Sequence, residues 1–265
     1  MDAVLLAGGV PTPDDPLYAL TQGRPKALLP LAGKPMAQWV VDALDGATTV
    51  ERIVVVGLPA TDVLHARKPM TYIPGAGDLL DNILAGLREV LRLNPASEFT
   101  LLASSDIPAV TAEIVDAMAV DATREAMDVV YHVVTRETME ARFPGANRTY
   151  LRLRDVAVCG ADLNVVRTGI VHGQVAEQVR RIIAARKNPL QEAAIVGWKL
   201  LLMVALRRWT LAQVAAEVTR RLHIVGAVHV TPYAEAAMDV DKPHQFEILQ
   251  RDLAARQHSL AEEPQ

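Results

Sequence analysis

A short apolar run that ends in two glycines constrains the fold of this chain more than any other feature. Residues 3–7 read Ala-Val-Leu-Leu-Ala, and Gly8 and Gly9 follow directly. A continuous apolar run closed by glycine is typical of a short buried strand. Glycine has no Cβ, so the turn after such a strand lets backbone N–H groups approach a ligand. The sequence predicts a strand and a turn that can hold phosphate, although an ordinary tight turn has the same pattern.

Further apolar runs alternate with amphipathic helical patterns along the first half of the chain. The predicted strands are residues 3–7, 52–56, 71–73, 99–103 and 128–134, and the predicted helices are residues 36–44, 79–91 and 112–119. Strands separated by helices indicate βαβ units on a mostly parallel sheet. Ligands of such sheets bind at the carboxyl ends of the strands, which is where the glycine turn falls.

The composition limits the kinds of protein that this chain can be. Its 265 residues, 51% of them hydrophobic, suffice for one large α/β domain with a substantial core. The net charge is −4, and no basic tract carries interleaved aromatic residues. Nucleic acid is therefore not expected as a partner.

The cysteine count and the apolar segments bear on the compartment. Cys159 is the only cysteine, which excludes an intramolecular disulfide and favours a reducing, cytoplasmic setting. No charged segment precedes the first apolar run, so no secretory signal is expected. Residues 193–206 are apolar but contain Lys199, and they fall short of the roughly 20 residues that a spanning helix needs. No membrane span is expected.

Two cations follow the glycine turn after a polar loop. Arg24 and Lys26 flank Pro25, and residues 27–36 lead into a predicted helix. A triphosphate needs both amides and side-chain cations to meet its charge, and this segment offers the cations. Lysine is scarce in a chain rich in arginine, so a lysine here suggests that a compact charge is needed. Lys34 is a second lysine in this segment, and it could orient the following helix rather than contact phosphate.

Carboxylates from two distant parts of the chain form a candidate cation site. Asp106 follows the predicted strand at residues 99–103 and precedes Pro108. Asp239 and Asp241 alternate along an extended segment, so they should point to the same side. Mg²⁺ is commonly held by one or two carboxylates together with substrate phosphates. Asp106 could instead cap the next helix.

The strings around these residues resemble the signature of the MobA-like nucleotidyltransferases. These strings are LLAGG and RPKALLPLAGKPM near the N-terminus, and SDIP and MDVDKP further on. The group includes molybdenum-cofactor guanylyltransferases, methylerythritol-phosphate cytidylyltransferases and sugar-1-phosphate nucleotidyltransferases. The resemblance implies a three-layer α/β fold with a Rossmann-like, mostly parallel mixed sheet, similar to the glycosyltransferase-A fold, and a helical insertion toward the C-terminus.

The resemblance also implies roles for individual residues. The triphosphate would lie against Leu6, Ala7, Gly8, Gly9 and Lys26. The catalytic residues would be Lys26, Arg24 and Asp106. Mg²⁺, with Mn²⁺ as the alternative ion, would be held by Asp106 and Asp241, and Asp239 has a lesser claim to the metal.

Residues 10–23 depart from the pattern of the group, which usually places an arginine soon after the glycines. Here the loop is longer and is acidic at Asp14 and Asp15. Arg24 could replace the missing arginine. The loop could equally be a lid over the nucleotide, because long loops in compact domains are often functional.

A second glycine-containing segment precedes the predicted helix at residues 79–91. In the resembling families this segment contacts the nucleobase and ribose, which makes Gly75, Gly77 and Asn82 candidates for nucleotide binding. The alternative is an ordinary strand-to-helix turn in which Asp78 is the N-cap.

The middle of the chain contains candidates for binding the acceptor. Arg148, Tyr150 and Arg152 alternate, so they could share one face of a strand and bind a phosphate. Exposed arginines on an edge strand are the alternative. Gly160 lies in a segment that resembles the acceptor-binding segment of sugar nucleotidyltransferases, and Lys187 is a further candidate phosphate contact.

Residues 173–223 read as an insertion within a single domain that spans residues 1–265. Three consecutive helices are predicted there, at residues 174–186, 190–206 and 210–222. Helices without an intervening strand suggest a cap over the acceptor pocket or the surface of a homodimer.

The function that the resemblance implies is nucleotidyl transfer. A Mg²⁺-dependent enzyme would join the NMP of an NTP to a phosphorylated sugar, polyol or cofactor and release pyrophosphate. The alternative is a nucleotide-binding or regulatory protein that kept the fold and lost turnover, which the altered glycine loop would favour.

Overall fold

The structure, a computed structural model, describes residues 1–265 except 61–62, 125–126, 173–197, 223–224 and 263–265. Its centre is a nine-stranded sheet with the order β5-β4-β1-β6-β10-β7-β9-β8, and β11 pairs with β7. The strands are β1 (Asp2–Leu6), β4 (Arg52–Val56), β5 (Met70–Ile73), β6 (Phe99–Ser104), β7 (Val129–Thr135), β8 (Leu151–Arg152), β9 (Ala157–Gly160), β10 (Leu163–Arg167) and β11 (Gly226–Val230). A separate small pair is β2 (Pro30–Leu31) with β3 (Lys34–Pro35).

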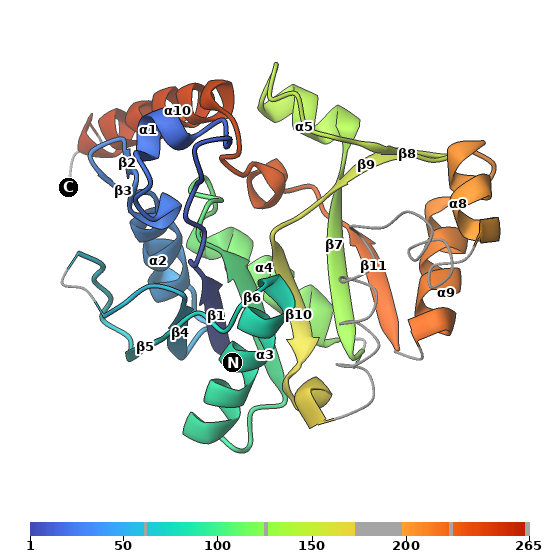
Figure 1. Cartoon of the computed structure of the whole chain (residues 1–265), viewed down its shortest axis with the longest axis horizontal. Helices are drawn as coiled ribbons and strands as arrows, with labels where there is room; N and C mark the ends of the chain where they lie inside the picture. Colours follow the sequence, from blue (N-terminus) through green and yellow to red (C-terminus); the bar gives the residue numbers. More distant parts are fainter. Residues whose placement is uncertain (61–62, 125–126, 173–197, 223–224, 263–265) are drawn as a thin grey trace.

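Helices cover both faces of this sheet, as Figure 1 shows. They are α1 (Tyr18–Thr21), α2 (Met36–Gly46), α3 (Leu79–Leu93), α4 (Ala112–Thr123), α5 (Arg136–Arg142), α8 (Trp198–Ala205), α9 (Leu211–Leu222) and α10 (Pro243–Glu262). Among the described residues, short 3-10 helices are η1 (Lys26–Leu28), η2 (Thr168–His172) and η4 (Ala234–Ala237). The predicted three-layer α/β fold with a mostly parallel mixed sheet is confirmed.

The half of the sheet that contains β1 is parallel. Strands β5, β4, β1 and β6 run in one direction, and Leu6 lies opposite both Val56 and Ser104. The carboxyl ends of three neighbouring strands therefore meet at one edge of the sheet. Four of the five predicted strands lie in this half and the fifth is β7; all five, and the three predicted helices α2, α3 and α4, are confirmed within a few residues.

The other half of the sheet is mixed. Strand β10 is antiparallel to both β6 and β7, while β11 runs parallel to β7. Strands β9 and β10 lie on the same side of β7 and are separated by two residues, so together they act as one bent strand. This bend carries the chain from the centre of the sheet to the β8 edge.

Strand β1 is buried on both faces, which explains its continuous apolar sequence. Ala3 and Leu5 face the larger core, which includes residues of α2, α4 and α10. Val4 faces the smaller core, together with Leu87 and Val90 of α3. Ala3, Val4 and Leu5 are all fully buried.

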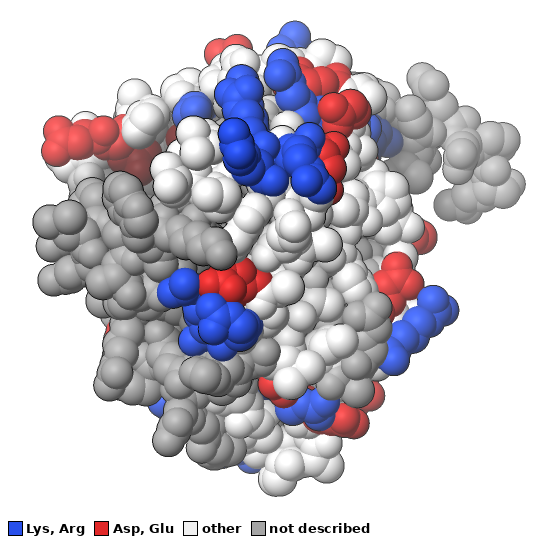
Figure 2. Space-filling model, turned by 90° about the vertical axis from the view of Figure 1, so that its right-hand side faces the viewer, with Lys and Arg blue, Asp and Glu red and all other residues white. Residues whose placement is uncertain are grey.

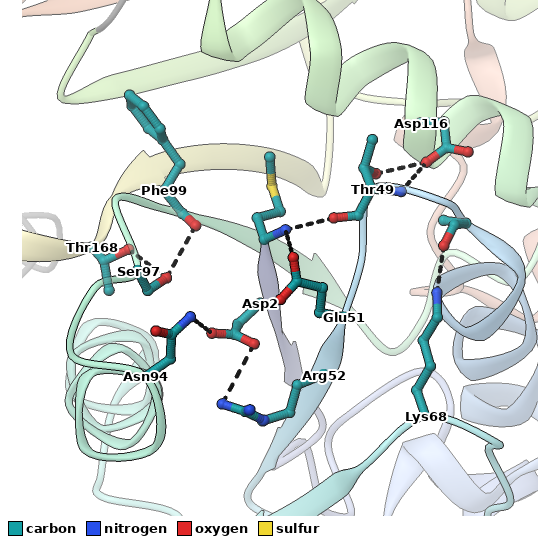
Figure 3. A network of polar contacts seen from close by, with 12 residues as sticks. Asp2, Thr49, Glu51, Arg52, Lys68, Asn94, Ser97, Phe99, Asp116 and Thr168 are labelled. Carbon is teal, nitrogen blue, oxygen red and sulfur yellow. Dashed lines mark hydrogen bonds and ion pairs between the residues drawn. The ribbon is translucent and has the colours of Figure 1, made fainter.

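Polar contacts fasten the segments around β1 to one another, as Figure 3 shows. Asp116 of α4 accepts hydrogen bonds from the backbone N–H and hydroxyl groups of Thr48 and Thr49, at 2.6–2.9 Å. The buried carboxylate of Asp2 accepts from Asn94 and lies 3.7 Å from the Arg52 guanidinium. These contacts join α4 to the segment before β4, and they join β4 and the end of α3 to the first strand.

The C-terminal helical segment is described in part. Helix α9 confirms the predicted helix at residues 210–222, and Thr210 caps it by accepting from Gln213 N–H at 3.3 Å. Helix α8 lies within the second predicted helix, whereas the predicted helix at residues 174–186 lies outside the described residues. The division into one domain with an insertion stays a prediction. No helix in the described ranges is long and apolar enough to cross a membrane.

Candidate active site

The first glycine turn packs backbone to backbone against the turn that follows β4. Ala7 N–H donates to the Val56 carbonyl at 2.8 Å, and Gly57 has a φ of +92°. A Cβ on Gly57 would lie 2.4 Å from the Gly8 Cα, so only glycine fits. The sequence interpretation missed Gly57. Its signal was available, because residues 52–56 are an apolar run closed by glycine, as residues 3–7 are.

Asn82 brings the second glycine segment beside the first turn. Its Oδ1 accepts from Ala76 N–H at 2.7 Å, and a Cβ on Gly8 would lie 3.6 Å from its Nδ2. The Oδ1 atom lies at the same distance from a Cβ placed on Gly75. Asp78 is the N-cap of α3, as the ordinary-turn reading predicts. The ordinary-turn reading is therefore confirmed, and the segment also lies next to the exposed Gly8. Nucleotide binding by Gly75, Gly77 and Asn82 stays a prediction.

Lys26 connects the glycine turn to two carboxylates. Its backbone N–H donates to the Gly9 carbonyl at 2.9 Å. Its Nζ lies 2.7 Å from Asp106 Oδ2 and 2.7 Å from Asp241 Oδ1. Burial alone would lower the pKa of Lys26, but the two carboxylates outweigh burial and raise the pKa above its ordinary value. Lys26 is therefore a fixed positive charge at the carboxyl edge of the sheet.

Backbone contacts bring the two carboxylates together, although Asp106 and Asp241 are 135 positions apart in the sequence. Ser105 N–H donates to the Leu6 carbonyl at 3.0 Å, which fixes the Asp106 loop at the end of β1. Val240 N–H donates to the Asp106 carbonyl, also at 3.0 Å. Thr111, and not Asp106, is the N-cap of α4. The capping alternative for Asp106 is thus wrong.

Gln245 holds the segment that carries Asp241. It is 1% exposed, and its Oε1 accepts from the N–H groups of Asp241 and Lys242 at 3.0 and 2.9 Å. These two N–H groups directly precede α10, so the Gln245 side chain, from the first turn of the helix, caps its N-terminus. The sequence interpretation gave Gln245 no role.

The two carboxylates fit a divalent cation. Asp106 Oδ1 is buried and has no hydrogen-bond partner, while the Asp241 side chain is 56% exposed. Across the described ranges, no group of three or more histidine, cysteine or acidic side chains could hold a metal ion. A cation here would therefore need further ligands from phosphate and water, which is the usual coordination of Mg²⁺ in proteins.

Asp239 differs from Asp241, although both line one cavity of about 240 Å³. Asp239 is 8% exposed and forms an ion pair with Arg148. The cavity is lined by Asn147, Arg148, Thr149, Cys159, Gly160, Asp239, Asp241, Lys242 and Gln245. Two predicted acceptor residues, Arg148 and Gly160, thus line the same cavity as Asp239 and Asp241.

The predicted strand that would place Arg148 and Arg152 on one face is wrong. Strand β8 contains only Leu151 and Arg152, and Arg152 is exposed, whereas the Arg148 side chain is 13% exposed. Gly145 and Asn147 have φ values of +77° and +50°, which turn the chain before the strand begins. Arg148 therefore points into the cavity and Arg152 lies at the outer edge of the sheet.

Gly160 has a structural reason to be glycine. A Cβ there would lie 2.0 Å from the Tyr131 Oη, so any side chain would displace the tyrosine. The neighbouring Cys159 is buried. Burial raises the pKa of the Cys159 thiol, which suits an inert core residue.

Asp162 is a carboxylate that the sequence interpretation assigned no role. It lies between β9 and β10, and its backbone carbonyl accepts from Ser104 N–H at 2.9 Å. Burial, and next the charge of Asp106, raise the pKa of Asp162 to about 7, although Arg148 opposes this shift. Only the bent β9–β10 strand brings it near the other carboxylates, so nothing local in the sequence could reveal it.

The other predicted cations are Arg24, Lys34 and Lys187, and the structure does not place any of them beside Lys26. Arg24 is exposed, and its Nε donates to the Thr21 carbonyl at 3.2 Å. Lys34 forms an ion pair with Asp42 and lies 3.7 Å from the centre of the Trp39 ring, so it contacts α2, as the alternative reading has it. Lys187 lies outside the described residues.

Comparison with protein families shows which family the chain belongs to. The model of the MobA-like NTP transferase domain matches residues 3–225. The chain belongs to the MobA-like NTP transferase family. This is a family of nucleotidyltransferases, so the predicted membership is confirmed. The matched range contains Lys26 and Asp106 and ends before Asp241.

Solved structures show the same fold. A hypothetical transferase from Thermus thermophilus is 34% identical, with a TM-score of 0.79, and the match covers 92% of this chain and 98% of that one. A CMP:2-keto-3-deoxy-manno-octonic acid synthetase complexed with CTP is 13% identical, with a TM-score of 0.56, over 96% and 98% of the two chains. The second likeness concerns the fold alone.

Two curated proteins match a short segment of this NTP transferase family member. They are the 2-C-methyl-D-erythritol 4-phosphate cytidylyltransferases of Synechococcus sp. (strain CC9902) and Parasynechococcus marenigrum (strain WH8102). Identity is 37% and 40% over 70 residues, which is 24% of this chain. The match spans 31% of the length of each relative.

Proposed function

We propose that this protein transfers an NMP group from an NTP to a small phosphorylated acceptor and releases pyrophosphate. The observation that carries this proposal is the position of the Lys26 ammonium, 2.7 Å from both Asp106 and Asp241 and next to the first glycine turn. This arrangement offers a cation for phosphate and carboxylates for a metal within one small volume.

The nucleotide would lie along the glycine edge of the sheet. Gly9 has open space at its α-carbon and Gly8 is exposed, so backbone N–H groups there can approach the phosphates. Lys26 would meet the charge that develops on the leaving pyrophosphate. Gly75 and Asn82, which lie beside Gly8, would contact the nucleoside.

Asp106 and Asp241 would hold Mg²⁺, or Mn²⁺ in its place. The ion would polarise the α-phosphate and neutralise part of its charge. The buried, unpartnered Asp106 Oδ1 supports this assignment, because a carboxylate oxygen away from water needs a positive partner. Asp239 is paired with Arg148 and would act indirectly, by orienting that arginine.

The acceptor would occupy the cavity next to Asp241. Arg148 is the buried cation of this cavity, and a phosphorylated sugar or polyol would place its phosphate there. An oxygen of the acceptor phosphate then attacks the α-phosphorus of the NTP. The new oxygen–phosphorus bond forms as the bond to the β-phosphate oxygen breaks. The ionised phosphate needs no general base.

The test is pyrophosphate release with Mg²⁺ and each of GTP, CTP, UTP and ATP, against sugar phosphates, polyol phosphates and molybdopterin-type acceptors. Release that requires one NTP and one acceptor supports the proposal and names both substrates. Tight binding of one NTP without release for any acceptor would contradict turnover and favour the regulatory alternative.

A further inference from the structure

Four exposed arginines gather where the β8–β9 turn meets the α8–α9 turn, at the β8 edge of the sheet. Arg152 ends β8 and Arg154 lies in the first turn, whereas Arg207 and Arg208 lie in the second. Arg154 N–H donates to the Trp209 carbonyl at 3.0 Å, which joins the two turns. We call these four arginines the arginine tip.

The charge of the arginine tip is not neutralised within the part of the chain that the structure describes. None of its four side chains forms an ion pair there, whereas Arg220 and Arg221 on the nearby α9 both pair with Glu217. The chain as a whole carries a net charge of −4. Figure 2, which faces the side where α8 and β8 lie, shows Lys and Arg side chains concentrated on the upper part of this face, with Asp and Glu side chains beside them.

Large aliphatic side chains are exposed beside the arginine tip. Leu206 is 55% exposed and directly precedes Arg207, and Leu202 lies one helical turn earlier and is 38% exposed. Leu151, next to Arg152, is 43% exposed. Three partly exposed leucines thus accompany the four arginines, so this surface is both basic and apolar. Such a surface suits a partner that is anionic outside and apolar just beneath.

We propose that the arginine tip docks the protein reversibly on an anionic lipid bilayer. Arginine side chains would meet lipid phosphates, while Leu202 and Leu206 enter the boundary between headgroups and acyl chains. A nucleic acid fits less well, because single strands bind mainly through stacked aromatic rings, and the exposed apolar groups here are aliphatic. This docking is independent of the nucleotidyl transfer proposed above.

Co-sedimentation of the full chain with vesicles tests this inference. One vesicle set is phosphatidylcholine, and the other contains phosphatidylglycerol as well. The wild type should bind only the anionic vesicles, and salt should weaken the binding. Each basic residue near an anionic surface strengthens binding about fivefold, so the Arg207→Asn and Arg208→Gln double variant should bind about 25-fold more weakly.

A matched control is the Arg220→Gln and Arg221→Gln double variant, whose arginines are already paired with Glu217. It should bind like the wild type. Leu206→Ser should weaken binding without changing its dependence on salt. Equal binding to both vesicle sets, or equal losses in the two double variants, would overturn the inference. The inference would also be overturned if single-stranded RNA bound the protein as tightly as the anionic vesicles do and displaced it from them.

Discussion

The Lys26 Nζ lies 2.7 Å from Asp106 Oδ2, although the two residues are 80 positions apart in the sequence. The same ammonium is 2.7 Å from Asp241 Oδ1. Two carboxylates that would otherwise repel each other are thus held by one positive charge. A divalent cation that binds these carboxylates must compete with Lys26, so nucleotide phosphates that draw the lysine away would favour the metal.

Replacing Lys26 with methionine should change metal binding and turnover in opposite directions. Without nucleotide, Lys26→Met should bind Mn²⁺ about tenfold more tightly, because the competing ammonium is gone. Pyrophosphate release should fall by about 10²–10³, the usual effect of removing one charge-stabilising donor. Electron paramagnetic resonance of Mn²⁺ and a pyrophosphate assay measure the two effects. Lys34→Met is the control, since Lys34 pairs with Asp42 instead. Unchanged Mn²⁺ affinity in Lys26→Met would contradict the competition.

Gly57→Ala should destabilise the protein far more than Gly33→Ala. Both glycines have left-handed φ values, +92° and +85°, so both alanines add a backbone cost of about 1 kcal/mol. A Cβ at position 57 would also lie 2.4 Å from the Gly8 Cα, whereas nothing lies within 4 Å at position 33. We expect an additional loss of about 2 kcal/mol or more for Gly57→Ala in urea unfolding. Equal losses of unfolding free energy in the two variants would contradict this prediction, because the turns at Gly8 and Gly57 could then move apart at no cost.

Asp116→Asn should lower stability at neutral pH and matter less in acid. Burial alone would raise the pKa of Asp116, but hydrogen bonds from Thr49 and Thr48 outweigh burial and hold it at about 2. The folded pKa lies below the ordinary value of 3.8, so the stabilisation is complete above about pH 4 and is lost as the pH falls toward 2. We expect a loss of about 1–2 kcal/mol at pH 7 by urea unfolding. A loss that stays constant from pH 7 to pH 3 would contradict this assignment.

Asp162→Asn should have the opposite dependence on pH. The folded pKa of about 7 lies above 3.8, so the wild type loses stability as the pH rises from about 4 to about 7. Asparagine stays neutral and escapes this loss. The variant should gain about 2–3 kcal/mol more over the wild type at pH 8 than at pH 5. Urea unfolding with a chelator present measures the difference, and an equal gain at both pH values would refute it.

The sequence predicted the parallel half of the sheet and the Lys26, Asp106 and Asp241 cluster because their signals are local. Each strand there is a short apolar run, and each cluster residue lies in a string of a few residues that resembles a family signature. Gly57 was missed although it closes an apolar run as Gly8 does, because its contact with Gly8 forms only when β1 and β4 pair.

The acceptor side of the cavity could not be predicted in the same way. Asp162 and Gln245 matter only through contacts made by distant segments, at the bent β9–β10 strand and at the start of α10. Arg148 was placed on a strand because its alternation with Arg152 suggested one. The left-handed residues Gly145 and Asn147 redirect the chain, and periodicity contains no sign of them.

The most direct test of the proposed active centre is pyrophosphate release by Asp106→Asn, with the NTP, acceptor and Mg²⁺ that serve the wild type. Asparagine keeps the shape of the side chain but removes the charge that would hold both the metal and Lys26. We predict a loss of at least about 10³ in kcat, with unfolding in urea little changed, and wild-type rates for the control Asp42→Asn. Full turnover by Asp106→Asn would contradict the assignment of this cluster as the catalytic centre.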